Sequence, residues 1–397
     1  MTRRQAASSG GLLLALVLAA LNLRPALTSV APVMERIVAD LDLSRATAGL
    51  VTTIPVLLMG LLAPLAPPLA ARWTQERVLA GALALVAGAL ALRACSDHGA
   101  LWLLLSAFGA GMGIAVAGPL MSSFIKQHFS RRVGGVIAAY SVSMTGGAAL
   151  AVVLTLPLSE ALGGSWSWAL AAWSLPALLA LLFWWWVVPT TGPAAKGTAR
   201  AERLPLRSAR AWLLTVFFAA QSGVFYALST WLVARYEQVG VPPLQASAYA
   251  SLFMGFGIAG ALLVPLLAGR VSDRRWLLVL VTGTTTLAIL LIAWRPEWLP
   301  WLVSATLGTS TAGTFALALA LPVLETESPQ QAASLTAMML CAGYLLGGGV
   351  PSLVGIGRDI SADYAWPFTF LAALSGLMVA ISLLLPSPPP RRGVLGG

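Results

Sequence analysis

The chain has 397 residues, of which 58% are hydrophobic and only 10% are charged, and its formal net charge is +10. Soluble domains carry roughly 25% charged residues, so a water-soluble fold is excluded and the lipid bilayer is the expected environment. The basic residues form short clusters between apolar runs, a pattern typical of membrane topology determinants, which argues against nucleic acid as a partner. The sequence has no phosphate loop, zinc-protease motif or serine-hydrolase motif. We therefore expect no enzyme activity, cofactor or metal.

Apolar runs of membrane-spanning length define the predicted elements. The first begins like a signal peptide, but it continues without a small-residue cleavage site and is interpreted as a membrane helix. The runs are continuous and do not alternate as the strands of a barrel do, so an all-α integral membrane fold is predicted. The twelve predicted helices lie near residues 11–34, 46–70, 78–96, 100–125, 134–158, 167–188, 211–235, 246–268, 276–294, 298–324, 332–356 and 366–386.

The distribution of lysine and arginine predicts the orientation. With the N-terminus inside, 17 basic residues fall in inner segments and 6 in outer segments. The outer six are Arg36, Arg45, Arg93, Arg235, Arg295 and Arg358. By the positive-inside rule, both termini are expected in the cytoplasm of a multi-pass protein of a bacterial-type inner membrane.

Two halves of similar sequence are separated by a basic linker rich in Ala, Gly and Pro. The predicted units are residues 1–188, a cytoplasmic linker at 189–210, and residues 211–397. "LAARWTQER" at 69–77 and "LAGRVSDRR" at 267–275 match at an offset of 198 residues. Glycine pairs in the fifth and eleventh helices, at 146–147 and 347–348, add to the similarity. Two pseudo-symmetric six-helix bundles indicate a secondary transporter that binds its substrate between the halves.

These features resemble the major facilitator superfamily over the whole chain. In that family the loops after helices two and eight carry Gly, Asp and basic residues, which implies gating roles for Arg72, Arg77, Asp273 and Arg274. The first loop lacks the expected Gly and Asp. "LNLRPALTSVAPVMERI", "GLVTTIPVLLMGLLAPLA" and "QSGVFYALSTWL" are similar to the branch that includes cyanate transporters and 2-nitroimidazole exporters. That branch implies a small polar or anionic solute.

Arg24 lies near the centre of the first apolar run, where a charge costs about 2.5–3.5 kcal/mol on insertion scales. Glu35, the nearest acid, is about 16 Å further along a helix, and no other predicted helix has a carboxylate near its midpoint. Pro25 is expected to bend the helix, and Thr28 shares a helix face with Arg24. We predict that Arg24 binds substrate, with Thr28 beside it. The alternative is that Arg24 binds carbonyls freed by kinks and never contacts substrate.

The seventh helix offers the other face of the predicted pocket. The offset of 198 pairs Arg24 with Ser222, which lies on a stripe with Phe225 and Tyr226, with Gln221 at its edge. Aromatic side chains with a few hydroxyls suit a small-molecule pocket. Further candidates, including those on helices four and ten that the resemblance implies, are Tyr140, Tyr344, Met112, Ser122, Thr309, Ser310 and Thr314.

Two transport functions fit these residues. The first is uptake of a small inorganic or organic anion, which Arg24 favours, and the second is export of a neutral nitroaromatic or drug-like compound. The expected partners are the small-molecule solute, a co- or counter-transported ion and the lipid bilayer, with the protein acting as a monomer. Because the core offers no carboxylate relay, exchange or a proton carried by the substrate is the expected form of energy coupling.

Overall fold

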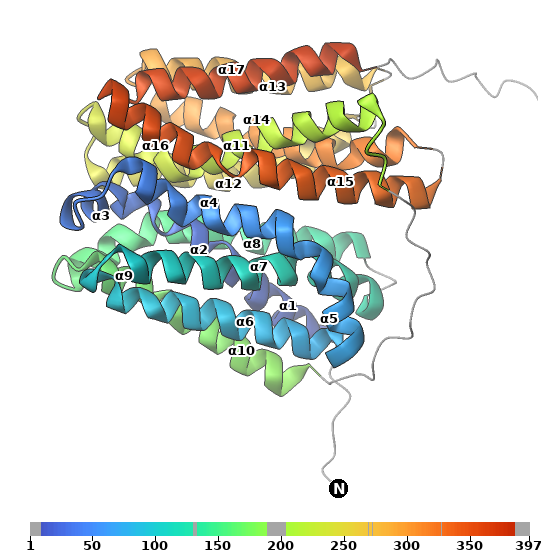
Figure 1. Cartoon of the computed structure of the whole chain (residues 1–397), viewed down its shortest axis with the longest axis horizontal. Coiled ribbons are helices and arrows are strands. Elements are labelled where there is room, and N and C mark those ends of the chain that lie inside the picture. The colour runs from blue at the N-terminus through green and yellow to red at the C-terminus, as the bar shows by residue number, and fades with distance from the viewer. Residues whose placement is uncertain are drawn as a thin grey trace, which may run out of the picture.

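The computed structural model describes residues 9–129, 133–188, 204–268, 270–271, 273–326 and 328–385, and these residues form a bundle of long helices (Figure 1). Within these ranges, twelve helical spans are long and apolar enough to cross a membrane, which confirms the predicted number. The spans are Ser9–Asp40, Arg45–Trp73, Gln75–His98, Ala100–Ile125, Gly135–Ala161, Trp166–Val187, Ala209–Gln238, Pro243–Ala268, Arg274–Trp294, Pro300–Pro322, Gln331–Ser361 and Ala365–Leu384.

The helices of the first half include several short pieces, and proline lies at or beside several of the interruptions. They are α1 (Ser9–Leu23), α2 (Pro25–Thr28), η1 (Ala31–Val33), α3 (Met34–Asp40), α4 (Arg45–Leu62), η2 (Ala63–Leu65), α5 (Ala66–Trp73), α6 (Gln75–Leu92), η3 (Arg93–His98), α7 (Ala100–His128), α8 (Val133–Ala161), α9 (Trp166–Ala172) and α10 (Ser174–Val187). The predicted linker lies outside the described residues as far as residue 203.

The second half has fewer interruptions. Its helices are α11 (Ala209–Gln238), α12 (Pro243–Ala268), α13 (Arg274–Trp294), α14 (Pro300–Leu324), α15 (Pro329–Gly347), α16 (Val350–Ser361) and α17 (Ala365–Leu384). In Figure 1, α1–α10 form one bundle and α11–α17 the other. Equivalent pairs of helices pack together in the two halves. In the first half α1 packs on α8 and α6 on α7; in the second half α11 packs on α15 and α13 on α14.

A glycine contact repeats in the two halves. A side chain at Gly147 of α8 would overlap the carbonyl of Leu21 in α1, and one at Gly347 of α15 would overlap the carbonyl of Ala219 in α11. Leu21 and Ala219 are 198 residues apart, the offset seen in the sequence. In each half, therefore, the absence of a Cβ lets the first and fifth spans cross at close range.

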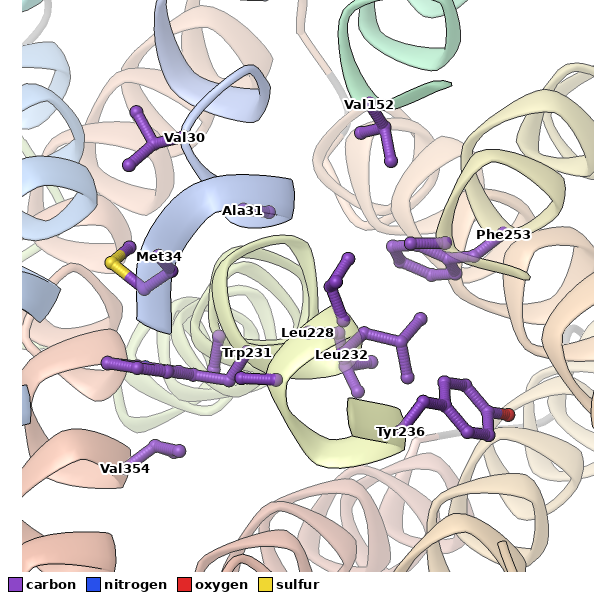
Figure 2. Close-up of a cluster of buried hydrophobic side chains, with 14 of the residues drawn as sticks. Val30, Ala31, Met34, Val152, Leu228, Trp231, Leu232, Tyr236, Phe253 and Val354 are labelled. Carbon is purple, nitrogen blue, oxygen red and sulfur yellow. The ribbon is translucent and has the colours of Figure 1, made fainter. Parts of the chain in front are cut away.

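The two halves are joined at the end of the bundle that carries α3, which we call the α3 end; the opposite end, which carries α5, is the α5 end. At the α3 end α16 packs on α4, and the ribbons of the halves diverge toward the α5 end (Figure 1). Figure 2 shows the apolar cluster here, with Trp231 of α11 between Met34 of α3 and Val354 of α16. The indole of Trp231 is fully buried and donates to the Pro351 carbonyl at 2.8 Å. The halves thus meet through a dry core at this end.

Candidate functional site

The first membrane span is broken at Arg24. Helix α1 ends at Leu23, and the single turn α2 begins at Pro25. Proline cannot donate a backbone hydrogen bond, and the Arg24 carbonyl instead accepts from the backbone nitrogens of Leu27 at 2.9 Å and Thr28 at 3.1 Å. The helix is interrupted at the point where a bend was predicted from Pro25, and the Arg24 side chain lies at the junction of the two helix pieces.

The Arg24 guanidinium faces aromatic rings of the other half. Its central carbon lies 5.1 Å from the ring centroid of Phe225 and 6.0 Å from that of Tyr226, both within the range of cation–π attraction. Among the residues that the structure describes, no carboxylate forms an ion pair with Arg24. The half-buried charge is thus held by ring faces and stays free to bind an acceptor.

A cavity of about 120 Å³ opens beside Arg24, between the two halves. Its wall is mostly apolar and includes Met144, Phe253, Met254 and Phe315. The full lining is Arg24, Ser141, Met144, Thr145, Ala148, Gln221, Ser222, Phe225, Tyr226, Phe253, Met254, Gly257, Ala261, Gly308, Ala312, Phe315 and Tyr344. No acidic side chain is in this set, and Arg24 supplies its one formal charge. An apolar pocket with a few polar groups is the usual form of a small-molecule site.

Two polar atoms of the lining have no hydrogen-bond partner among the described residues. Gln221 donates from Nε2 to the Thr311 carbonyl at 3.3 Å, which leaves its Oε1 without a donor. The Ser222 hydroxyl is also unpartnered. Both residues are almost completely buried. Unpaired buried polar groups carry a desolvation cost of about 1–3 kcal/mol, which a bound solute can relieve.

Six of the eight predicted substrate-site residues line the cavity: Arg24, Gln221, Ser222, Phe225, Tyr226 and Tyr344. Tyr140 is not in the lining, although it is close enough to interact electrostatically with Arg24. Thr28 is not in the lining either, because its hydroxyl donates to the Ala148 carbonyl at 3.3 Å and to the Arg24 carbonyl at 3.2 Å. Its place beside Arg24 along the chain did not bring it into the cavity.

Helix α14 contributes residues other than those predicted for it. Gly308, Ala312 and Phe315 line the cavity, whereas Thr309, Ser310 and Thr314 do not. Ser310 instead accepts from Thr285 of α13 at 2.8 Å. Met112 and Ser122 of α7 are also absent from the lining.

The sequence reading missed the contribution of α8 and α12. Ser141 and Thr145 are four residues apart on α8, so they share a face, and both line the cavity. Two hydroxyls at this spacing in an apolar helix are the signal that would have found them. On α12, Phe253, Met254 and Gly257 have no such signal, since their spacing is that of ordinary helix packing.

Contacts of the predicted gating residues are found within their own halves. Arg72 lies 5.5 Å from the ring of Trp73, and the backbone nitrogen of Arg77 donates to Thr74. Asp273 accepts from the backbone nitrogen of Arg275 at 3.0 Å, and Arg274 donates to the Ala268 carbonyl at 3.2 Å. These loops lie at the α5 end, where the ribbons of the halves diverge (Figure 1).

A polar network joins the halves at the α3 end. Glu35 accepts from Nε and Nη2 of Arg45 at 3.1 and 2.5 Å, and from the Tyr364 hydroxyl of the other half at 2.6 Å. Asp359 accepts from the backbone nitrogens of Arg45 and Ala46 at 3.2 and 3.1 Å, so its carboxylate caps α4. Burial, and then the Glu35 charge, raises the pKa of Tyr364 well above its usual value. Tyr364 therefore remains a hydrogen-bond donor at neutral pH.

Two of the arginines counted in outer segments, Arg93 and Arg235, are buried within helical spans. Arg93 is completely buried and donates to the Ala26 carbonyl at 2.5 Å, and to Ser29 and Ser106 at 3.0 Å each. Arg235 donates to the carbonyls of Ile292 at 3.1 Å and Ala293 at 2.6 Å. The acceptors of Arg93 include a carbonyl next to the break at Arg24, so this arginine supports the broken span.

Comparison with known proteins identifies the fold. A model of the Major Facilitator Superfamily matches residues 12–350. The chain belongs to this superfamily. It is 33% identical to the cyanate transport protein CynX of Escherichia coli (strain K12), over 93% of this chain and 95% of that protein. It is 32% identical to the 2-nitroimidazole transporter of the same organism, over 94% of each chain.

Solved structures agree with the superfamily assignment. A mutant of the nucleoside transporter NupG superposes with a TM-score of 0.78 at 16% identity, covering 94% of this chain and 99% of that one. This superfamily member is accordingly a membrane transporter and not an enzyme. Its twelve spans and bacterial relatives make it a multi-pass inner membrane protein.

Proposed function

We propose that the protein is a secondary active transporter of a small polar or anionic solute, which it binds at Arg24 between the halves and moves by alternating access. The observation that carries the proposal is the unpaired Arg24 cation in a cavity lined by both halves. A guanidinium presents a planar fork of donors that suits carboxylates, cyanate-like anions and nitro groups. The names of two relatives, a cyanate and a 2-nitroimidazole transporter, support solutes of this kind.

The second candidate is export of neutral nitroaromatic compounds such as 2-nitroimidazole. The aromatic residues of the cavity wall, Phe225, Tyr226, Phe315 and Tyr344, favour it. These rings provide apolar area that a triatomic anion does not need. The two candidates share Arg24 as the binding group and differ in the solute.

Counterflow tests both candidates. Proteoliposomes loaded with unlabelled solute would be assayed for uptake of the same labelled compound, with cyanate, small organic acids and 2-nitroimidazole as the panel. We expect at least one compound to accumulate in wild-type liposomes and not in Arg24→Ala liposomes. Equal accumulation by both proteins would exclude Arg24 as the binding residue.

The moving units in this proposal are residues 1–188 and 211–397, joined by the linker at 189–210, in a monomer. Both termini are placed in the cytoplasm, so the α3 end faces the outside. The Glu35–Arg45–Asp359–Tyr364 network then closes the outer side in this state. In the other state, Arg72, Arg77, Asp273 and Arg274 are proposed to join the halves at the α5 end.

Energy coupling follows from the charge of the cavity. Moving one charge against the membrane potential costs about 2.3 kcal/mol per 100 mV, so entry of an anion into a negative cell needs a coupled step. The cavity lining holds no carboxylate to carry a proton. Exchange of solutes, or a proton carried by the solute itself, is the proposed coupling.

A further inference from the structure

Resting on the proposed function, we infer that the substrate is a planar, ring-sized solute with two different polar ends: an acceptor group bound by Arg24 and an N–H or O–H donor bound by Gln221. Both functions lie against α11: Arg24 faces Phe225 of this helix, and Gln221 lies one turn before Phe225. The inference distinguishes this substrate class from simple anions such as cyanate, which carry no donor.

The orientation of the Gln221 amide is fixed by its neighbour. Thr311 offers a carbonyl, which only accepts, so the atom 3.3 Å from it is the amide nitrogen. The amide oxygen is then the atom left without a partner, in a residue that is 1% exposed. Because Gln221 lines the cavity, this buried acceptor lies at the cavity wall, where a donor on the solute can pair with it.

The two functions lie along one face of α11. Arg24 lies over the ring of Phe225, and Gln221 precedes Phe225 by four residues. Positions four apart share a helix face and lie roughly 6 Å apart along the helix axis. A ring with polar substituents at opposite ends suits this arrangement better than a triatomic anion does.

The wall between the two functions suits a flat apolar body. Phe225, Tyr226, Phe315 and Tyr344 contribute ring faces, and Met144 and Met254 contribute flexible apolar contacts. The Ser222 hydroxyl, next to Gln221 and also without a partner, supplies a second hydrogen-bonding group that both donates and accepts. Donor recognition is assigned to Gln221, because its free atom is an acceptor only.

Matched probes test the requirement for a donor. Binding of 4-hydroxybenzoate, 4-methoxybenzoate and benzoate to the purified full-length protein would be measured calorimetrically in detergent. At about pH 6 the carboxylates are ionised and the phenol is protonated. We expect 4-hydroxybenzoate to bind about tenfold more tightly than both other acids. Its phenol can donate a hydrogen bond to the buried Gln221 oxygen, and one such bond is worth about this factor in affinity. Benzoate excludes size as the cause, since it is smaller than 4-hydroxybenzoate and lacks the donor.

A second pair repeats the test on a neutral solute. We expect 2-nitroimidazole to bind more tightly than 1-methyl-2-nitroimidazole, in which a methyl group replaces the N–H. The two series share the donor and differ in the acceptor group. Equal affinities within both series for the wild-type protein would overturn the inference, and so would the absence of binding by every probe.

The Gln221→Leu variant tests whether Gln221 causes the preference for solutes with a donor. This variant is expected to lose the preference for 4-hydroxybenzoate over benzoate. Gln245→Leu is the matched control, because Gln245 is exposed at the start of α12 and donates to Tyr249 outside the cavity. A preference that persists in Gln221→Leu overturns the assignment; if that variant does not fold, the wild-type series still decides the donor requirement.

A different result would contradict the proposed function than would contradict the donor requirement. If the three acids bind equally and Arg24→Ala abolishes their binding, the solute site stands and only the donor requirement is wrong. If Arg24→Ala binds all probes as the wild type does, the site itself is wrong.

Discussion

Arg24 is a cation that the protein inserts into the membrane at a cost, and no described carboxylate forms an ion pair with it. Buried arginines in the same molecule are treated differently. Arg93 and Arg235 donate to backbone carbonyls, and Arg235 also lies 3.4 Å from Asp363. Within the described part of the chain, Arg24 lies against the ring faces of Phe225 and Tyr226 and has no ion pair. This difference in partners separates an arginine available to a solute from arginines that hold helices together.

Variants of Arg24 distinguish a role in solute binding from a role in folding stability. We expect Arg24→Ala to lose solute binding by about tenfold or more while its melting temperature stays near that of the wild type, because the deletion also removes an insertion cost. Arg24→Lys should recover little, since an ammonium lacks the planar fork. Calorimetry and thermal unfolding in detergent measure the two effects side by side.

Arg295→Ala is the control for that experiment, because Arg295 is exposed and pairs only weakly with Glu297, at 3.9 Å. It should change neither quantity. If Arg24→Ala instead melts far below the wild type, Arg24 is a structural residue and the solute site lies elsewhere.

At the scale of single elements, the break in the first span depends on a partner from the third. Arg93 donates three hydrogen bonds, to Ala26, Ser29 and Ser106. Two of these acceptors lie within five residues of Arg24. The orientation of the Arg24 side chain is therefore set by the junction that Arg93 supports, as well as by Pro25.

Arg93→Met should destabilise the protein by about 3 kcal/mol or more, since buried acceptors lose charged donors, and it should also weaken solute binding. Arg235→Met removes a similar set of buried hydrogen bonds in the other half, away from Arg24. We expect comparable drops in melting temperature for the two variants, but a loss of affinity only for Arg93→Met. Equal loss of affinity in both would show that Arg93 has no specific link to the solute site.

The sequence predicted the elements better than it predicted their contacts. The twelve spans and the break at Pro25 are local properties of composition and backbone chemistry, so they were visible along the chain. Thr28 was placed in the site by helix spacing, but the one-turn helix α2 directs its hydroxyl to Ala148, 120 residues away. The burial of Arg93 depends on acceptors 64 and 67 residues distant. The role of α8 and α12 depends on how the halves pack, which no single segment encodes.

At the scale of the whole molecule, the network at the α3 end joins two bodies that the proposed cycle has to separate. Glu35→Gln keeps the shape of the side chain but removes the charge that binds Arg45 and accepts from Tyr364. We expect this variant to populate a state in which the halves are further apart at this end. The measurement is electron–electron double resonance between spin labels at Glu160 and Ile360, two exposed positions in different halves.

In the double-resonance experiment, the population with a longer distance between the two labels should be larger in Glu35→Gln than in the protein that retains Glu35. Glu297→Gln, outside the network, is the control and should leave the distance distribution unchanged. Cys95 and Cys341 have to be replaced first, so that the labels are unique. Identical distributions for all three proteins would mean that the network does not hold the α3 end closed.

Orientation in the membrane is open to a direct test with thiols. Cys95 is exposed at the α3 end, and Arg207 is exposed just before α11. An impermeant reagent added to intact cells should label native Cys95. It should not label Arg207→Cys in a background without Cys95 and Cys341, whereas a permeant reagent should. The reverse pattern would invert the proposed topology.

The two buried arginines also bear on the history of the molecule. Arg93, at the end of the third span of the first half, binds the first span; Arg235, at the end of the first span of the second half, binds the third. Under the offset of 198 residues their counterparts are Leu291 and Ile37. Neither arginine is thus a copy of the other. If the halves descend from one duplicated ancestor, at least one of these links was acquired after the duplication. In divergent relatives, selection is then expected to preserve the link between first and third spans while the position of the arginine changes.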